Sequence, residues 1–202
     1  MLDLILRPAK ERLLAPAARA VGNSMSPLAV TLTAFVAGAA AALSAARGAY
    51  HLALVLWLLN RALDGFDGTL ARTQGRQTDA GGLLDIVLDF VVYAAIPIAL
   101  VVAQPSRPTA IAGLLLLGSF YVNSASWMYL AAVLERRDAG ARARGELTSI
   151  VMPSGLVEGT ETILFYSLFL LLPNRLVPLF AVMSVLVMLT VIQRMAWALR
   201  VL

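Results

Sequence analysis

Residues 60–72 read NRALDGFDGTLAR, and eight residues later residues 81–89 read GGLLDIVLD. Five of the chain's 12 acidic residues lie between Asp64 and Asp89. Both pieces sit in long runs of apolar residues. An ionisable residue inside such a run is energetically expensive and is therefore a candidate for function.

The composition around that stretch is typical of a membrane protein. The chain has 202 residues, of which 60% are hydrophobic and 14% charged, whereas a soluble domain carries about 25% charged residues. Its mean hydropathy is +0.82. We therefore predict an all-α integral membrane protein with one compact domain. The sequence has no Cys and a single His, His51, which excludes disulfides, thiolate metal ligands, Cys nucleophiles and a His-rich metal site.

Six transmembrane helices are predicted, because a span needs roughly 20 mostly apolar residues. Prolines at 105, 108 and 173 mark breaks between them. Ser26 is a plausible N-cap for the first span, and Thr78 and Asp79 are candidate caps for the third. The predicted spans, which make up a domain at residues 23–202, are Pro27–Ala45, Tyr50–Arg72, Thr78–Ala103, Thr109–Leu134, Leu147–Leu172 and Leu176–Val201.

Residues 1–22 are predicted to form an amphipathic helix that lies in the membrane interface beside the six spans. Apolar residues fall at helical spacing and the charges lie largely elsewhere, which favours this interpretation over a disordered basic tail. Pro8 suits a helix start, and Pro16 is expected to end or kink the helix. The many charges of this segment, Arg7, Lys10, Glu11, Arg12 and Arg19, exclude a signal peptide.

The basic residues predict the orientation in the membrane. Three lie at one set of helix ends, namely Arg47, Arg107 and Arg175. Twelve lie at the opposite ends, namely Arg7, Lys10, Arg12, Arg19, Arg72, Arg76, Arg136, Arg137, Arg142, Arg144, Arg194 and Arg200. Since cytoplasmic segments carry the excess of Lys and Arg, we predict that both termini lie in the cytoplasm. The expected location of the protein is the bacterial inner membrane.

The acidic residues form two pairs on neighbouring spans. Asp64 and Asp67 are three residues apart, and Asp85 and Asp89 are four apart, so each pair shares a helix face. A rise of 1.5 Å per residue puts the first pair about 8 and 12 Å above the cytoplasmic end and the second about 10 and 16 Å above it. We therefore expect four carboxylates to converge in one pocket that opens to the cytoplasm.

Four such carboxylates indicate a divalent metal site that acts on phosphates. Hard oxygen ligands without Cys or His suit Mg²⁺ or Mn²⁺, and two ions could stabilise the attacking and leaving oxygens of a phosphoryl transfer. Arg72 can clamp a phosphate. Four glycines leave room for a nucleotide against the backbone, namely Gly65, Gly68, Gly81 and Gly82.

The pattern D-x2-D-G-x2-A-R-x8-G-x3-D-x3-D resembles the signature of the CDP-alcohol phosphatidyltransferase family. Every position is filled, by Asp64, Asp67, Gly68, Ala71, Arg72, Gly81, Asp85 and Asp89. The resemblance implies transfer of a phosphatidyl group from CDP-diacylglycerol to an alcohol, with release of CMP, by a homodimer. It also implies that the four Asp hold metal and that Asp89 is the general base. The CDP pocket would be lined by Asp67, Gly68, Ala71, Arg72, Gly81 and Asp85.

The acceptor alcohol is less clearly indicated. Members that use inositol phosphate place Arg where this chain has Gly159 and Thr162, which favours an unphosphorylated polyol or amino alcohol, with glycerol phosphate still open. Glu158 and Glu161 lie on one helix face and can bind hydroxyls or an amine; the structural alternative is a buried pair satisfied by its neighbours. Arg136, Arg137 and Arg144 are further candidates for acceptor binding, although such a run more often reports orientation.

Other functions and roles stay open. The chain could transfer CDP-choline or CDP-ethanolamine headgroups, make cardiolipin from phosphatidylglycerol, conduct ions or protons through its acidic cluster, or be an inactive scaffold. The Asp residues could instead be structural and pair with Arg61, Arg72 or Arg76. Asn60 is expected to orient Asp64, and Asn123 and Ser126 are expected to bond between helices. Nothing indicates nucleic-acid binding.

Overall fold

The computed structural model describes residues 3–138 and 155–202, and this part of the chain is helical without strands. Most helices begin and end within a few residues of the bounds predicted from the apolar runs of the sequence. Their bounds are α1 Asp3–Val21, α2 Pro27–Ala46, α3 Tyr50–Gln74, α4 Asp79–Ala103, α5 Arg107–Arg136, α6 Gly159–Leu171, the 3₁₀ turn η1 Pro173–Arg175, and α7 Leu176–Val201.

Local capping explains where the helices begin and end. The Ser26 hydroxyl accepts the backbone N–H of Ala29 at the start of α2, and the Thr78 hydroxyl accepts that of Gly81 at the start of α4. The predicted caps Ser26 and Thr78 are therefore confirmed, whereas Asp79 is the first residue of α4 and does not cap it. α3 ends at Gly75, whose φ of 62° is a left-handed conformation that glycine adopts readily.

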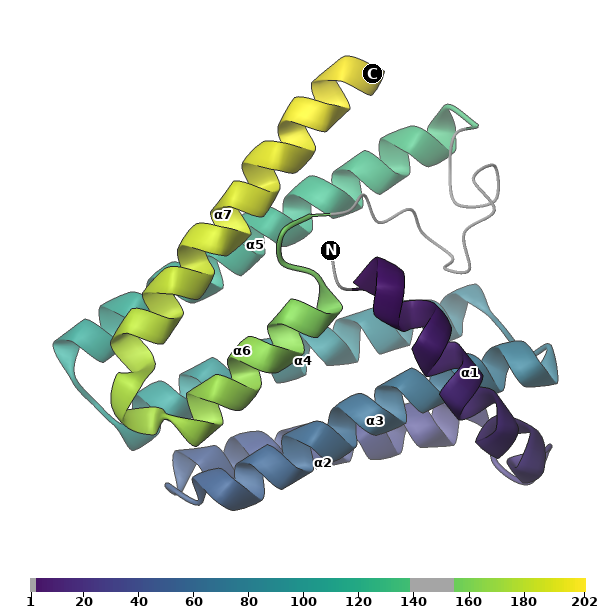
Figure 1. Ribbon diagram of the computed structural model, residues 1–202, viewed down its shortest axis with the longest axis horizontal. Helices are drawn as coiled ribbons and strands as arrows, with labels where there is room; N and C mark the ends of the chain where they lie inside the picture. The colour runs from purple at the N-terminus through teal and green to yellow at the C-terminus, as the bar shows by residue number, and fades with distance from the viewer. Residues whose placement is uncertain (1–2, 139–154) are drawn as a thin grey trace.

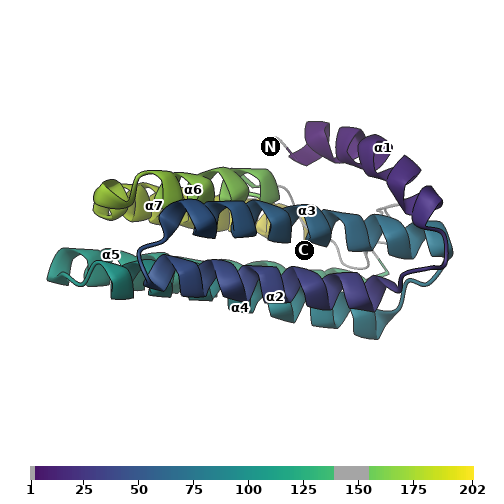
Figure 2. The same cartoon turned by 90° about the horizontal axis from the view of Figure 1, so that it is seen from below.

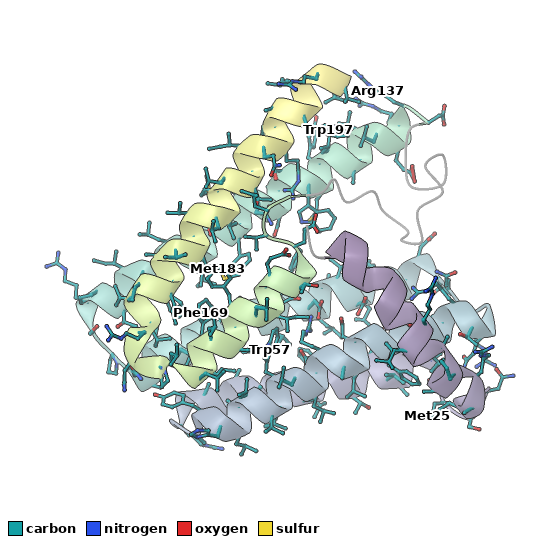
Figure 3. All side chains as sticks on the ribbon, viewed as in Figure 1. Met25, Trp57, Arg137, Phe169, Met183 and Trp197 are labelled. Atoms are coloured by element: carbon teal, nitrogen blue, oxygen red, sulfur yellow. The ribbon has the colours of Figure 1, made fainter. Side chains whose placement is uncertain are left out.

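The helices run back and forth, so that their connections gather at two ends. Figure 1 shows the α2–α3, α4–α5 and α6–α7 connections on one side and the α3–α4 connection on the other. α2 packs against both α3 and α4, α5 packs along α7, and α6 rests on α3. The main core includes Trp57, Tyr166, Phe169 and Phe180, which are fully buried. Trp57 and Phe169 lie on the inner sides of their helices (Figure 3).

A close contact between Gly38 of α2 and the Val92 side chain limits the spacing of α2 against α4. A Cβ atom on Gly38 of α2 would lie 2.6 Å from Val92 Cγ2 and 3.0 Å from Asn60 Nδ2. Only glycine fits there without displacing both neighbours. This contact brings α2, α3 and α4 together directly beside the acidic cluster.

Within the described ranges, four helical segments are long and apolar enough to cross a membrane: α2, α4, α5 and the continuous segment Pro173–Val201. α3 has 25 residues and carries charges at Arg61, Asp64 and Asp67, so its role as a span stays a prediction. The predicted fifth span, Leu147–Leu172, is wrong as one helix. Residues 155–158 are not helical and α6 has only 13 residues; residues 147–154 lie outside the described residues.

The N-terminal helix α1 lies across α3 outside the bundle (Figure 2). Its Ala18 packs with Val30 of α2 and Leu70 of α3. The helix continues past Pro16 to Val21, so Pro16 does not end it, and a kink at Pro16 stays a prediction. The Gln74 amide donates to the Met25 carbonyl at 2.9 Å, which ties the end of α3 to the connection that follows α1. Placement of α1 in a membrane interface stays a prediction.

Candidate active site

A small cavity of about 10 Å³ lies between α2, α3 and α4, with room for about one water molecule. Asp64 reaches it from α3, and Asp85 and Asp89 reach it from α4. All three are half-buried. The predicted convergence of carboxylates from two neighbouring helices is therefore observed for three of the four. The remaining lining residues are Thr31, Ala34, Phe35, Asn60, Leu88 and Val92.

Arg61 pairs with the carboxylates of this cavity. Its Nη2 and Nη1 donate to Asp89 Oδ1 and Oδ2 at 2.5 and 3.1 Å, a two-pronged contact that fixes the plane of the carboxylate. Nη1 also lies 3.7 Å from Asp64 Oδ2. The sequence offered a carboxylate as one possible partner of Arg61, and the structure identifies Asp89 as the main one.

The Arg61 side chain is held by neighbours that the motif does not contain. Its Nε donates to Asn60 Oδ1 at 2.7 Å, and Asn60 Nδ2 donates to the Ala34 carbonyl at 2.8 Å. The guanidinium carbon lies 4.8 Å from the Trp57 ring centre and 4.9 Å from that of Tyr93, within the range of cation–π attraction. Asn60 thus positions Arg61, where the sequence led us to expect that it orients Asp64.

Asp67 is buried and is not one of the residues that line the cavity. Its Oδ2 accepts a 2.6 Å hydrogen bond from the Thr31 hydroxyl of α2. Sequence reasoning missed Thr31. Thr31 is a polar residue one turn into an apolar span, and this position could have marked it as a candidate. It lies outside the motif, which begins at Asp64.

The motif residues beyond the carboxylates lie at the same ends of α3 and α4. A Cβ on Gly68 would sit 3.4 Å from Arg72 Nη1, so glycine leaves the guanidinium room. Arg72 Nη2 lies 3.3 Å from the Thr69 hydroxyl, to which it donates. A Cβ on Gly81 would lie 3.0 Å from the capping hydroxyl of Thr78. Gly68 and Gly81 therefore keep this region open, as a nucleotide pocket requires, and Ala71 has a small side chain there.

The predicted metal site depends on how close the carboxylates lie to one another. Across the two described ranges, no three acidic or His side chains lie close enough together to hold a metal ion. Asp67 is engaged by Thr31 and Asp89 by Arg61. The donor chemistry nevertheless suits a hard divalent cation, because all four residues supply carboxylate oxygens.

Glu158 and Glu161 lie at the start of α6, where Glu158 is the N-cap and Glu161 is in the first turn. Each carboxylate accepts a backbone N–H from the other residue, which forms a capping box. Glu161 Oε2 accepts the N–H of Glu158 at 3.1 Å, and Glu158 Oε1 accepts that of Gly155 at 2.8 Å. These bonds give both carboxylates a structural role, and their contact with an acceptor stays a prediction.

Two of the three basic residues proposed for the acceptor site lie in the described part of the chain. Arg136 and Arg137 lie at the end of α5, where Arg137 donates to the Leu202 carbonyl at 2.7 Å, and Figure 3 shows Arg137 and Trp197 at this end of α5 and α7. Arg144 lies outside the described residues. Arg194, predicted only as an orientation charge, is buried between α5 and α7. Its Nη1 donates to Asn123 Oδ1 and Ser126 Oγ at 2.8 and 2.9 Å, which confirms the predicted interhelical bonding.

A family model for CDP-alcohol phosphatidyltransferases matches residues 24–201, a range that contains all eight motif residues. The chain belongs to the CDP-alcohol phosphatidyltransferase family. It is also 40% identical over 174 residues to the inner membrane protein YnjF of Escherichia coli K12, a match that covers 86% of this chain and 83% of that protein.

The fold of this family member is similar to that of solved structures. Phosphatidylinositol phosphate synthase (PgsA1) of Mycobacterium tuberculosis with CDP-DAG bound superposes with a TM-score of 0.72 at 23% identity, over 93% of this chain and 94% of that one. The same enzyme in complex with manganese and citrate gives 0.68 at 23% identity, over 92% and 88% of the two chains. At this level of identity the likeness establishes a shared fold.

Proposed function

We propose that this protein transfers the phosphatidyl group of CDP-diacylglycerol to an alcohol and releases CMP. The observation that carries the proposal is the cavity at which motif carboxylates from α3 and α4 meet. Membership of the CDP-alcohol phosphatidyltransferase family supports it. The fold likeness to an enzyme that was solved with CDP-DAG supports a diacylglycerol nucleotide as the donor.

We propose Mg²⁺ or Mn²⁺ as the cofactor, held by Asp64, Asp67, Asp85 and Asp89. Four carboxylates have enough oxygens for two ions, which is the number predicted from the sequence alone. Binding requires carboxylates of this set to come closer together than they are in this structure. When bound, a divalent ion would offset the charge of the pyrophosphate oxygens and of the departing CMP. The manganese complex of PgsA1 supports a divalent metal.

The chain's own residues bind and orient the donor. Asp67 and Asp85 flank the nucleotide, while Gly68, Ala71 and Gly81 allow it to approach the backbone. Arg72 holds phosphate oxygens and stabilises the negative charge that develops on CMP. Since α3 and α4 pack within the bundle, the acyl chains can stay in the bilayer while the CDP group occupies the cytoplasmic end of the site.

Asp89 is the proposed general base. The contact with Arg61 uses one lone pair on each of its oxygens, and a carboxylate offers about four acceptor positions. A free position accepts the proton of the acceptor hydroxyl. The acceptor oxygen then bonds to the phosphorus that carries diacylglycerol, and the bond from this phosphorus to the CMP oxygen breaks.

The acceptor is proposed to be an unphosphorylated polyol, an amino alcohol or glycerol phosphate that enters from the cytoplasm. Glu158, Glu161, Arg136, Arg137 and Arg144 are the candidate residues for binding it. A bacterial inner-membrane location is supported by the likeness to YnjF. Six spans, cytoplasmic termini and a homodimer complete the proposal, and cysteine labelling of single-Cys variants with cross-linking of the membrane-embedded chain tests these three points.

The deciding experiment incubates the purified full-length protein with labelled CDP-diacylglycerol, Mg²⁺ and a panel of alcohols. We expect acceptor-dependent CMP release and one labelled phospholipid on thin-layer chromatography. Phosphatidylglycerol in the panel detects cardiolipin formation, and labelled CDP-choline or CDP-ethanolamine with diacylglycerol detects headgroup transfer. Ion or proton flux in liposomes that lack CDP-lipid, without CMP release in any mixture, would overturn the proposal in favour of transport.

A further inference from the structure

The guanidinium of Arg61 lies between two of the four motif carboxylates. It contacts both oxygens of Asp89 on α4 and lies 3.7 Å from Asp64 Oδ2 on α3. Both acids line the same cavity. Arginine does not lose its proton in proteins, so this part of the cavity permanently contains a positive charge supplied by the chain itself.

This cation is fixed by its surroundings. The Arg61 side chain is only 5% exposed. Nε is bound by Asn60, and Nη1 also donates to the Tyr93 hydroxyl at 2.7 Å. The rings of Trp57 and Tyr93 flank the guanidinium. Tyr93 is in turn held from α6, where the Tyr166 hydroxyl donates to its carbonyl at 2.6 Å.

The position of Arg61 limits where a metal ion can bind. An Mg²⁺ ion lies about 2.1 Å from its oxygen ligands, so an ion that bridged Asp64 and Asp89 would enter the space that the guanidinium fills. Two cations at that separation repel strongly in a partly buried site. Moving Arg61 away would leave a buried charge without its partner, which is strongly unfavourable.

Asp67 and Asp85 lie on the other side of the acidic cluster from the Arg61–Asp89 contact. Asp67 is engaged by a neutral hydroxyl, that of Thr31, which can remain hydrogen-bonded to one oxygen while the carboxylate binds a metal. Asp85 lines the cavity from the turn of α4 before Asp89. Asp64, Asp67 and Asp85 together supply enough oxygens for one ion.

We propose that Arg61 takes the place of a second metal ion between Asp64 and Asp89, so that the site binds one divalent cation. The inference rests on the proposed function, which supplies the reason for a metal, and it revises the count of two predicted from four carboxylates. Arg61 precedes the family pattern, which begins at Asp64, so this substitute cation is a feature of the chain that the motif does not encode.

The test is a titration of the detergent-solubilised full-length protein with Mn²⁺ in the presence of CDP-diacylglycerol and without an acceptor. Calorimetry counts the bound ions, and electron paramagnetic resonance distinguishes an isolated Mn²⁺ from a spin-coupled pair. We expect one isolated ion per chain. Arg61→Met is expected to raise the count to two, whereas Arg61→Lys keeps it at one. Arg194→Met is the matched control, because Arg194 is as buried as Arg61, at 6% exposure for each residue, and its bonds go to Asn123 and Ser126 of α5. This variant should leave the count at one.

A coupled pair in the wild-type protein, or a single ion in a folded Arg61→Met variant, would overturn the inference. If Arg61→Met does not fold, the wild-type spectrum decides alone. CMP release is measured on the same preparation to separate the two proposals. Release with two bound ions overturns only the role of Arg61, and one bound ion without release for any acceptor overturns only the transferase function. Absence of bound Mn²⁺ overturns both.

Discussion

The Thr31 hydroxyl donates a 2.6 Å hydrogen bond to Asp67 Oδ2, and this bond joins α2 to the motif on α3. Asp67 is 4% exposed, so its carboxylate depends on partners within the protein. Through Thr31, a helix that carries no residue of the motif helps to set the orientation of a motif carboxylate.

Replacing Thr31 by Val removes the donor and leaves the shape of the side chain nearly unchanged. We expect a loss of about 10- to 100-fold in metal affinity or CMP release, the usual effect of removing a residue that orients a metal ligand. Steady-state release at several Mg²⁺ concentrations measures it. Thr33→Val is the matched control, since Thr33 is exposed and bonds only within α2. Equal activity of the two variants would remove Thr31 from the site.

Asp89→Asn replaces the proposed base with a neutral side chain of the same size. We expect turnover to fall by roughly 10²- to 10⁴-fold, the range for loss of a general base, while CDP-diacylglycerol still binds. Single-turnover CMP release and equilibrium binding of the labelled donor measure the two effects. Asp79→Asn, at the start of α4, controls for loss of an acidic residue. A near-normal rate in Asp89→Asn would show that another group takes the proton.

Gly38→Ala tests the close approach of α2 to α4. The added methyl would overlap Val92, and overpacking of this kind lowers the free energy of unfolding by about 1–3 kcal/mol. Thermal unfolding in detergent measures the change. Gly118→Ala is the control, because a Cβ at Gly118 meets no atom within 4 Å. Equal melting temperatures for the two variants would contradict the tight packing of α2.

Glu161 is predicted to stabilise the start of α6. Glu161→Ala removes the acceptor for the Glu158 N–H and should lower stability by about 1 kcal/mol, whereas Glu161→Gln keeps an acceptor oxygen and should melt like the wild type. Thermal unfolding compares the three proteins. A wild-type melting temperature for Glu161→Ala would refute the cap, and a raised acceptor KM in Glu161→Gln would assign the charge to acceptor binding.

Local features of the sequence determined much of the molecule. The motif from Asp64 to Asp89 was enough to recognise the family, because its eight residues lie at fixed spacing within one short segment of the chain. The starts of α2 and α4 followed from Ser26 and Thr78, since a cap acts on backbone groups two or three residues away. Helical periodicity also placed the two acidic pairs at similar depth on neighbouring helices.

The start of α6 was harder to predict. Glu158 and Glu161 looked like acids within a long apolar run, yet they cap a short helix. The pattern of a capping box has Ser or Thr first, and Glu in that position gave no recognisable signal. Arg194 was similarly indistinguishable from an orientation charge until α5 was seen beside α7.

By itself, the sequence determined the family, the helical fold and the identity of the motif carboxylates, because each depends on residues close together in the chain. The partners of those carboxylates depend on how the helices pack, and they became known from the structure. Thr31 is 36 residues from Asp67 and Arg61 is 28 from Asp89. Such pairs are set by how α2, α3 and α4 pack. The rotation of each helix about its own axis decides which of its side chains face the neighbouring helix.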